Sequence, residues 1–99
     1  MKKQERVCIE KYVKDFSFML TYEEFDNQIK FKILKNDGAC KALFNKYEQN
    51  QRELKDAIID ECEKWIEELK DNSNYHLTSD SFFVFTEEKF IYELSFSDS

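Results

Sequence analysis

Proline is absent from the 99 residues, and glycine occurs once, as Gly38. A loop that binds phosphate groups needs several glycines so that its backbone can approach the ligand, which argues against such a nucleotide site. Histidine also occurs once, as His76, in the polar segment DNSNYHLTSDS of residues 71–81. We interpret this segment as a loop between a helix and a hairpin, and we expect His76 to be a surface residue without a catalytic role.

Catalytic and metal-binding motifs are missing as well. A single histidine in a polar loop does not build a Ser–His–Asp or Cys–His arrangement. Asp60, Glu63 and Glu67 share one helical face and are the alternative ligands for a hard cation, but no EF-hand or HExxH pattern surrounds them. We therefore predict a protein that is not an enzyme and that has no cofactor and no metal site.

The three cysteines, Cys8, Cys40 and Cys62, form no CxxC pair and are odd in number. We expect them to be reduced thiols that behave as small buried hydrophobic residues. No apolar run approaches the roughly 20 residues that a membrane helix needs, and the N-terminal MKKQERVCIEKYV lacks the apolar part of a signal peptide. These features predict a cytoplasmic protein, or one in the host-cell cytoplasm if a phage encodes it, with no membrane partner.

Two pairs of apolar runs predict two antiparallel hairpins. Residues 16–22 and 29–33 alternate apolar and polar side chains on either side of the short EEFDN connection. Residues 82–86 and 90–96 flank Glu87-Glu88-Lys89. The run FFVF at 82–85 is apolar on both faces, which is typical of a central strand that is covered on both sides.

In the middle of the chain, apolar residues recur at the spacing of an α-helix. An apolar stripe predicts a main helix at 51–70, and it consists of Leu54, Ile58, Cys62, Trp65 and Leu69. A single helix over residues 38–70 would be about 50 Å long, too long for so small a domain, so we expect a separate short helix at 39–47. Asn50 and Glu53 supply the capping signal for the main helix.

The first residues fit two structures. Ile9, Tyr12, Val13 and Phe16 form a helical stripe, whereas Val7, Ile9 and Val13 also alternate as in a strand. We favour a helix, so the expected fold is one α+β domain over residues 1–99 in the order α-ββ-α(α)-ββ. Its four-stranded antiparallel sheet carries the main helix on one face.

Charge is distributed unevenly along the chain, whose formal net charge is −6. Residues 1–47 carry ten basic and seven acidic groups, whereas residues 48–71 carry four and nine. At 100° per residue, carboxylates recur along the main helix opposite its apolar stripe. The candidate partner-binding residues are Glu53, Asp56, Asp60, Glu63, Glu67 and Asp71. A solvated face of an acidic helix is the alternative interpretation.

A row of carboxylates can replace phosphates in a groove that evolved for nucleic acid. Small acidic phage proteins that inhibit nucleases, including DNA-mimicking anti-restriction and anti-CRISPR proteins, resemble this chain in size and charge. The resemblance implies a basic protein partner, such as a nucleic-acid enzyme, and no direct binding of nucleic acid. An immunity protein that neutralises a cognate toxin fits the same features.

The second candidate surface lies on the other face of the predicted sheet. Alternation leaves an apolar set away from the helices: Met19, Leu34, Phe82, Val84 and Ile91. Exposed apolar patches of this kind often mark an interface, so we predict a homodimer or a protein partner there. A homo-oligomeric interaction subunit without inhibitory role is thus a further alternative, and the N-terminal segment is the competing cover for this face.

Overall fold

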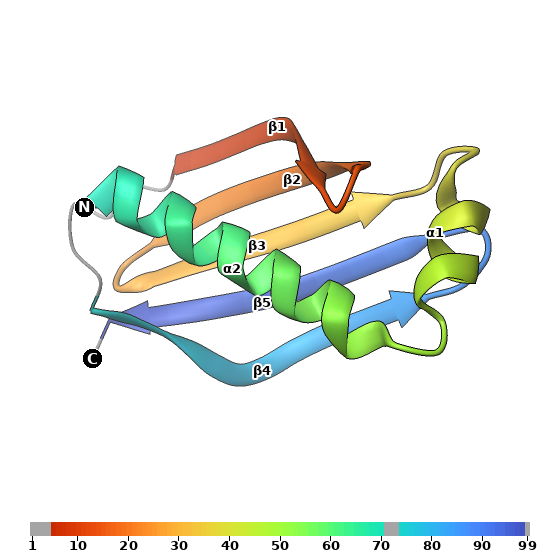
Figure 1. The fold of residues 1–99 in the computed structure, drawn as a ribbon. Helices are drawn as coiled ribbons and strands as arrows, with labels where there is room; N and C mark the ends of the chain where they lie inside the picture. Colours follow the sequence, from red (N-terminus) through yellow and green to blue (C-terminus); the bar gives the residue numbers. More distant parts are fainter. Residues whose placement is uncertain (1–4, 71–73, 99) are drawn as a thin grey trace.

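The computed structural model describes residues 5–70 and 74–98, which form a five-stranded sheet and two helices (Figure 1). The strands are β1 (Glu5–Val13), β2 (Phe16–Phe25), β3 (Gln28–Lys35), β4 (Tyr75–Phe85) and β5 (Phe90–Asp98). The helices are α1 (Cys40–Tyr47) and α2 (Gln51–Lys70). Neither described helix is long and apolar enough to cross a membrane.

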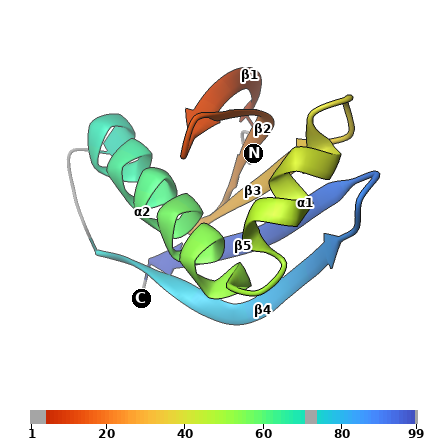
Figure 2. The same cartoon turned by 45° about the vertical axis from the view of Figure 1, so that its right-hand side comes forward.

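The sheet is antiparallel throughout, with the strand order β1-β2-β3-β5-β4. Both helices lie on the same face, and α2 crosses the strands diagonally (Figures 1 and 2). We call this the covered face and the opposite one the open face. The α+β class is therefore as expected, whereas the four-stranded sheet was wrong.

The core lies between the covered face and the helices. Alternate residues of β2, β3 and β5 are buried there, and the largest are Phe18, Phe31, Phe90 and Phe96. The buried stripe of α2 is Leu54, Ile58, Cys62 and Ile66, at a spacing of four residues. Leu69, which was predicted to belong to this stripe, is 48% exposed, so that part of the prediction was wrong. Trp65 is half-buried, with its ring 5.4 Å from Tyr22 and 5.7 Å from Phe31.

The N-terminal segment is a strand, so the predicted first helix was wrong. Residues 5–13 pair with β2 along their whole length, from Glu5 opposite Glu24 to Val13 opposite Phe16. Lys14 and Asp15 close this hairpin with φ angles of 54° and 70°, as in a two-residue type I′ turn. Such turns usually contain glycine, and the lack of one hid the hairpin.

Strand β4 corrects two further expectations. It begins at Tyr75, so most of the predicted loop at 71–81 is strand, while residues 71–73 lie outside the described chain. It also forms an edge of the sheet rather than its centre. Phe83 and Phe85 pack on the covered face, whereas Phe82 is 51% exposed on the open face.

The two helices predicted for the middle of the chain and the two predicted hairpins are confirmed. α1 ends at Tyr47 and α2 begins at Gln51, so the helical region is interrupted, as the length of a single helix over residues 38–70 led us to expect. Asn50 donates from Nδ2 to Glu53 Oε1 at 3.1 Å, beside the start of α2. The radius of gyration is 13.7 Å, close to the value of about 13 Å expected for a chain of this length.

Candidate partner-binding surfaces

The acidic face of α2 comprises Glu53, Asp56, Asp60, Glu63 and Glu67, all of them exposed. Burial of the apolar stripe against the sheet fixes the rotation of the helix, and these carboxylates therefore point away from the core. Asp71, the sixth residue predicted for this surface, lies outside the described residues.

Ion pairing divides this face into two parts. Glu53 lies 3.4 Å from Lys14 Nζ, which belongs to the turn between β1 and β2. Within residues 5–70 and 74–98, no salt bridge is made by Asp56, Asp60, Glu63 or Glu67. Carboxylates three or four residues apart repel one another by a few tenths of a kcal/mol per pair, so an external cation would relieve an existing cost.

The three lysines of α2 are directed elsewhere. Lys55 lies over the ring of Phe83, with Nζ 4.1 Å from its centroid. Lys64 lies 3.8 Å from Glu61, at the flank of the acidic face. Lys70 binds Glu24 of β2 at the far end of α2. The charge of Asp56, Asp60, Glu63 and Glu67 is therefore not balanced by these lysines.

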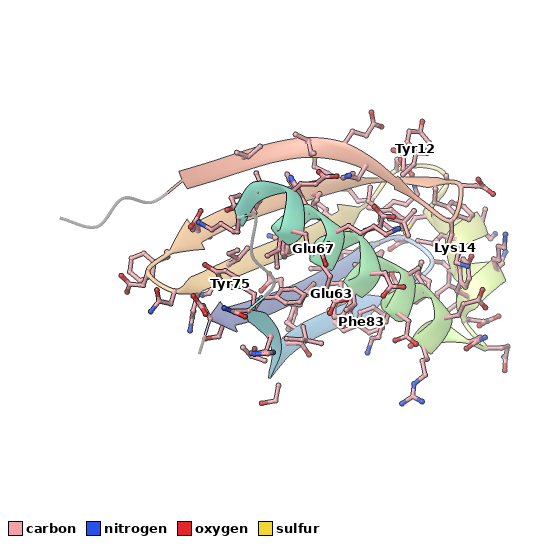
Figure 3. All side chains as sticks on the ribbon, turned by 60° about the vertical axis from the view of Figure 1, so that its left-hand side comes forward. Tyr12, Lys14, Glu63, Glu67, Tyr75 and Phe83 are labelled. Atoms are coloured by element: carbon pink, nitrogen blue, oxygen red, sulfur yellow. The ribbon has the colours of Figure 1, made fainter. Side chains whose placement is uncertain are left out.

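A small hollow adjoins the acidic face where α2 meets β4. It measures about 210 Å³ and is lined by Glu63, Ile66, Glu67 and Tyr75. Figure 3 shows the two carboxylates on α2 and Tyr75 on the neighbouring strand. An aromatic ring beside two carboxylates suits an Arg or Lys side chain, because both the charge and the ring face attract a cation.

The open face carries the second predicted set. Met19 and Phe82 are 45% and 51% exposed, while Leu34, Val84 and Ile91 are half-buried. Strand register aligns Met19, Leu34, Ile91 and Val84 as cross-strand neighbours. Four of the five residues thus form one row across four strands, and Phe82 lies two positions from Val84 on β4. Strand β1 lies at the sheet edge instead of covering this set.

Beside this row the open face is hollowed and polar. The hollow has a volume of about 500 Å³. Its lining is Thr21, Glu23, Gln28, Lys30, Phe31, Lys32, Thr78, Ser81, Phe82, Glu93, Leu94 and Ser95. The sequence did not predict this hollow, because its shape depends on the twist of the sheet and on the irregular start of β4.

His76 lies in β4 and is exposed, on a strand rather than in the expected loop. Among the described residues, no group of three His, Cys, Asp or Glu side chains is placed to hold a metal ion. Burial raises the pKa of the Cys40 and Cys62 thiols, which favours their protonated, unreactive forms.

The prediction of buried cysteines holds for Cys40 and Cys62 and was wrong for Cys8, which is exposed. Cys8 pairs with Thr21 on the open face, because strand alternation turns it away from the core. Comparison of the chain with protein-family models, curated proteins and solved structures found no match.

Proposed function

We propose that this protein is a small acidic inhibitor that binds a basic protein through the acidic face of α2. The observation that supports it is the row of four exposed carboxylates, Asp56, Asp60, Glu63 and Glu67, without an internal ion pair in the described chain. The row follows the helix for about 16 Å, at 1.5 Å per residue. A basic groove for nucleic acid, as in a nuclease, offers the complementary surface.

The mechanism is occlusion. The carboxylates steer the inhibitor to the basic groove and then take the places of phosphate groups, so nucleic acid is excluded while the complex lasts. The hollow beside Glu63 and Glu67 gives this contact a geometric anchor, since a cationic side chain can enter it and lie against Tyr75. No catalysis by the inhibitor is needed.

The test starts with affinity capture of partners from the native host, eluted with a salt gradient and identified by mass spectrometry. The variant Asp56→Lys/Asp60→Lys/Glu63→Lys/Glu67→Lys should remain folded and lose the captured basic protein. The matched control reverses four other exposed carboxylates: Glu48, Glu68, Glu87 and Glu88. It changes the net charge equally, so loss of binding in both variants, or in neither, contradicts a specific role of the acidic face.

An immunity protein would use the same face against a toxin, and the identity of the captured partner separates it from a nuclease inhibitor. A non-inhibitory interaction subunit is the second candidate, favoured by the exposure of Met19 and Phe82. Phe82→Glu should then abolish an association that is insensitive to salt, without unfolding the chain. Light scattering and circular dichroism measure the two properties.

A further inference from the structure

The outer edge of β1 is unusually regular for the edge of a sheet. Within the described residues no strand pairs with it, and Figures 1 and 2 show β1 at the margin of the sheet. Its nine residues contain no proline, and their register with β2 has no irregularity. A long edge of this kind is a template for another strand, and proteins commonly interrupt such edges.

The opposite edge of the sheet is interrupted in this way. In β4, residues 78–80 separate Leu77 from Ser81, whereas a single residue separates the two partners, Phe96 and Leu94, in β5. The two extra residues break the regular spacing of backbone groups that an added strand would need. Of the two edges, β1 is therefore the one suited to strand addition.

The turn next to β1 defines which backbone groups face outward. Val13 and Phe16 close a two-residue hairpin and are a hydrogen-bonded pair, as this turn type requires. Counting back by twos, Ile9 and Val7 also turn their backbone groups toward β2. The backbone N–H and C=O groups of Arg6, Cys8 and Glu10 therefore point toward the free edge.

The sequence of β1 is complementary to itself when it is reversed. An antiparallel pair centred on Cys8 sets each charged residue of ERVCIEK opposite a residue of the other sign, and each aliphatic residue opposite an aliphatic one. The pairs are Glu5 with Lys11, Arg6 with Glu10, Val7 with Ile9, and Cys8 with Cys8. The centre also suits the backbone, because both Cys8 residues present outward groups and can form a hydrogen-bonded pair.

Neighbouring registers lack this match. A pair centred on Glu10 sets that carboxylate opposite its own copy, and a pair centred on Arg6 does the same with two positive charges. Centring on Ile9 sets Val7 opposite Lys11. Like charges directly opposite each other destabilise strand pairing, so the sequence favours the register centred on Cys8.

Exposed apolar groups accompany this edge on its covered-face side. Val7 is 42% exposed although its partner Tyr22 is buried, and Leu69 in the last turn of α2 is 48% exposed. Lys70 of the same turn binds Glu24, the partner of Glu5 at the start of β1, so this turn lies at the start of the strand. A second strand along β1 would place Ile9 of one copy opposite Val7 of the other and cover part of this surface.

We propose that two copies of this protein associate by antiparallel pairing of their β1 strands, centred on Cys8, into one continuous sheet. Two-fold symmetry requires a self-complementary surface, and the charge pattern of β1 meets that requirement. Both copies then present α2 on the same side of the joined sheet. This surface does not include the acidic face of α2, and on the open face it adjoins Met19, the cross-strand partner of Glu10.

Charge exchange at one cross-strand pair tests both the contact and its register. Arg6→Glu and Glu10→Arg each create like-charged pairs across the two-fold axis and should weaken self-association roughly tenfold or more. The double variant restores opposite charges and should recover association. A mixture of the two single variants should form heterodimers, because every exchanged pair is then complementary. Light scattering and native mass spectrometry measure these outcomes, and circular dichroism confirms folding.

Cys8 reports the register directly. The two thiols should react with a short thiol-to-thiol cross-linker, because residues in a hydrogen-bonded antiparallel pair have Cα atoms about 5.5 Å apart. Cys8→Ser should prevent cross-linking and leave association intact, and Phe82→Glu on the open face should leave both intact. A monomer in light scattering, or association that Phe82→Glu abolishes and the charge exchanges leave unchanged, would overturn the proposal.

Discussion

The two faces of the sheet differ in how far their side chains are buried. On β3 the alternate residues Ile29, Phe31 and Ile33 are buried beneath the helices, while Lys30 and Lys32 between them are exposed. The covered face thus carries most of the burial that stabilises the fold. The open face retains Met19 and Phe82 with large exposed fractions, which contribute little to folding. Substitutions on the covered face should change stability strongly, whereas those on the open face should change it little.

The largest contrast should come from neighbouring residues of β3. Phe31 is 1% exposed and its ring lies 5.7 Å from those of Tyr22, Trp65 and Phe96. Phe31→Ala removes this packing and should lower the free energy of unfolding by about 3–5 kcal/mol. Lys32→Ala, on the open face, should change it by no more than about 0.5 kcal/mol. Urea denaturation measures both, and similar losses would refute the contrast between the faces.

Lys35 gives a smaller contrast because it is a charged residue on the covered face. It is 4% exposed, and its Nζ donates to the Ser17 carbonyl at 2.7 Å and to Asp37 Oδ2 at 3.1 Å. Lys35→Ala leaves the carbonyl without this donor and should cost about 1–3 kcal/mol of unfolding free energy. Lys30→Ala is the exposed control.

Lys35→Met separates the hydrogen bonds from the packing of the aliphatic stem. If it is as stable as the native chain in urea denaturation, the ammonium group contributes nothing to stability and the prediction for Lys35 fails.

Acid should weaken the fold through two carboxylates. The hydrogen bond from Lys35 lowers the pKa of Asp37. Burial raises the pKa of Glu24, but hydrogen bonds from Lys70 and Tyr22 outweigh it, so the net change is a lowered pKa. Because both folded-state pKa values lie below the unfolded ones, this stabilisation is full above the ordinary carboxyl range and is lost as the pH falls through the folded values.

The measurement is the midpoint of thermal unfolding against pH. Asp37→Asn/Glu24→Gln should lower the midpoint near neutral pH and flatten its decline in acid. An acid profile as steep in this variant as in the native chain would assign the decline to other carboxylates.

The sequence predicted those helices and strands that carry a clear apolar periodicity of their own. The period of two in β2 and β3 and the apolar stripe of α2 each specify a face that packs toward the core. At the end of α2 the buried residue is Ile66, and the predicted Leu69 is exposed. The prediction for β1 was wrong because Lys11 occupies a covered-face position and interrupts the apolar alternation. Its Nζ lies 5.8 Å from the centroid of the Trp65 ring. A long lysine stem can cover a ring and keep its charge in solvent, which a simple apolar pattern does not register.

The candidate surfaces were predictable to different degrees. The acidic face follows from helical geometry and the position of one apolar stripe, so its residues could be named in advance. The hollow beside Glu67 could not be predicted, because Tyr75 reaches it from the first part of β4, which was interpreted as loop. The complementary charge pattern of β1 is present in the sequence, but it indicates an interface only because the structure places β1 at the edge of the sheet.

The smallest expected effect is a difference in the rate of thiol modification between the exposed and the buried cysteines. Cys8 is exposed on the open face, whereas Cys40 and Cys62 are buried. A thiol reagent should therefore modify Cys8 promptly in the native protein and the other two only as the chain opens, because burial raises their pKa and blocks access. Mass spectrometry of the labelled protein gives the count. Cys8→Ser should eliminate the fast phase and change the free energy of unfolding by no more than about 0.5 kcal/mol, whereas prompt labelling of Cys62 would contradict the packing of α2 on the sheet.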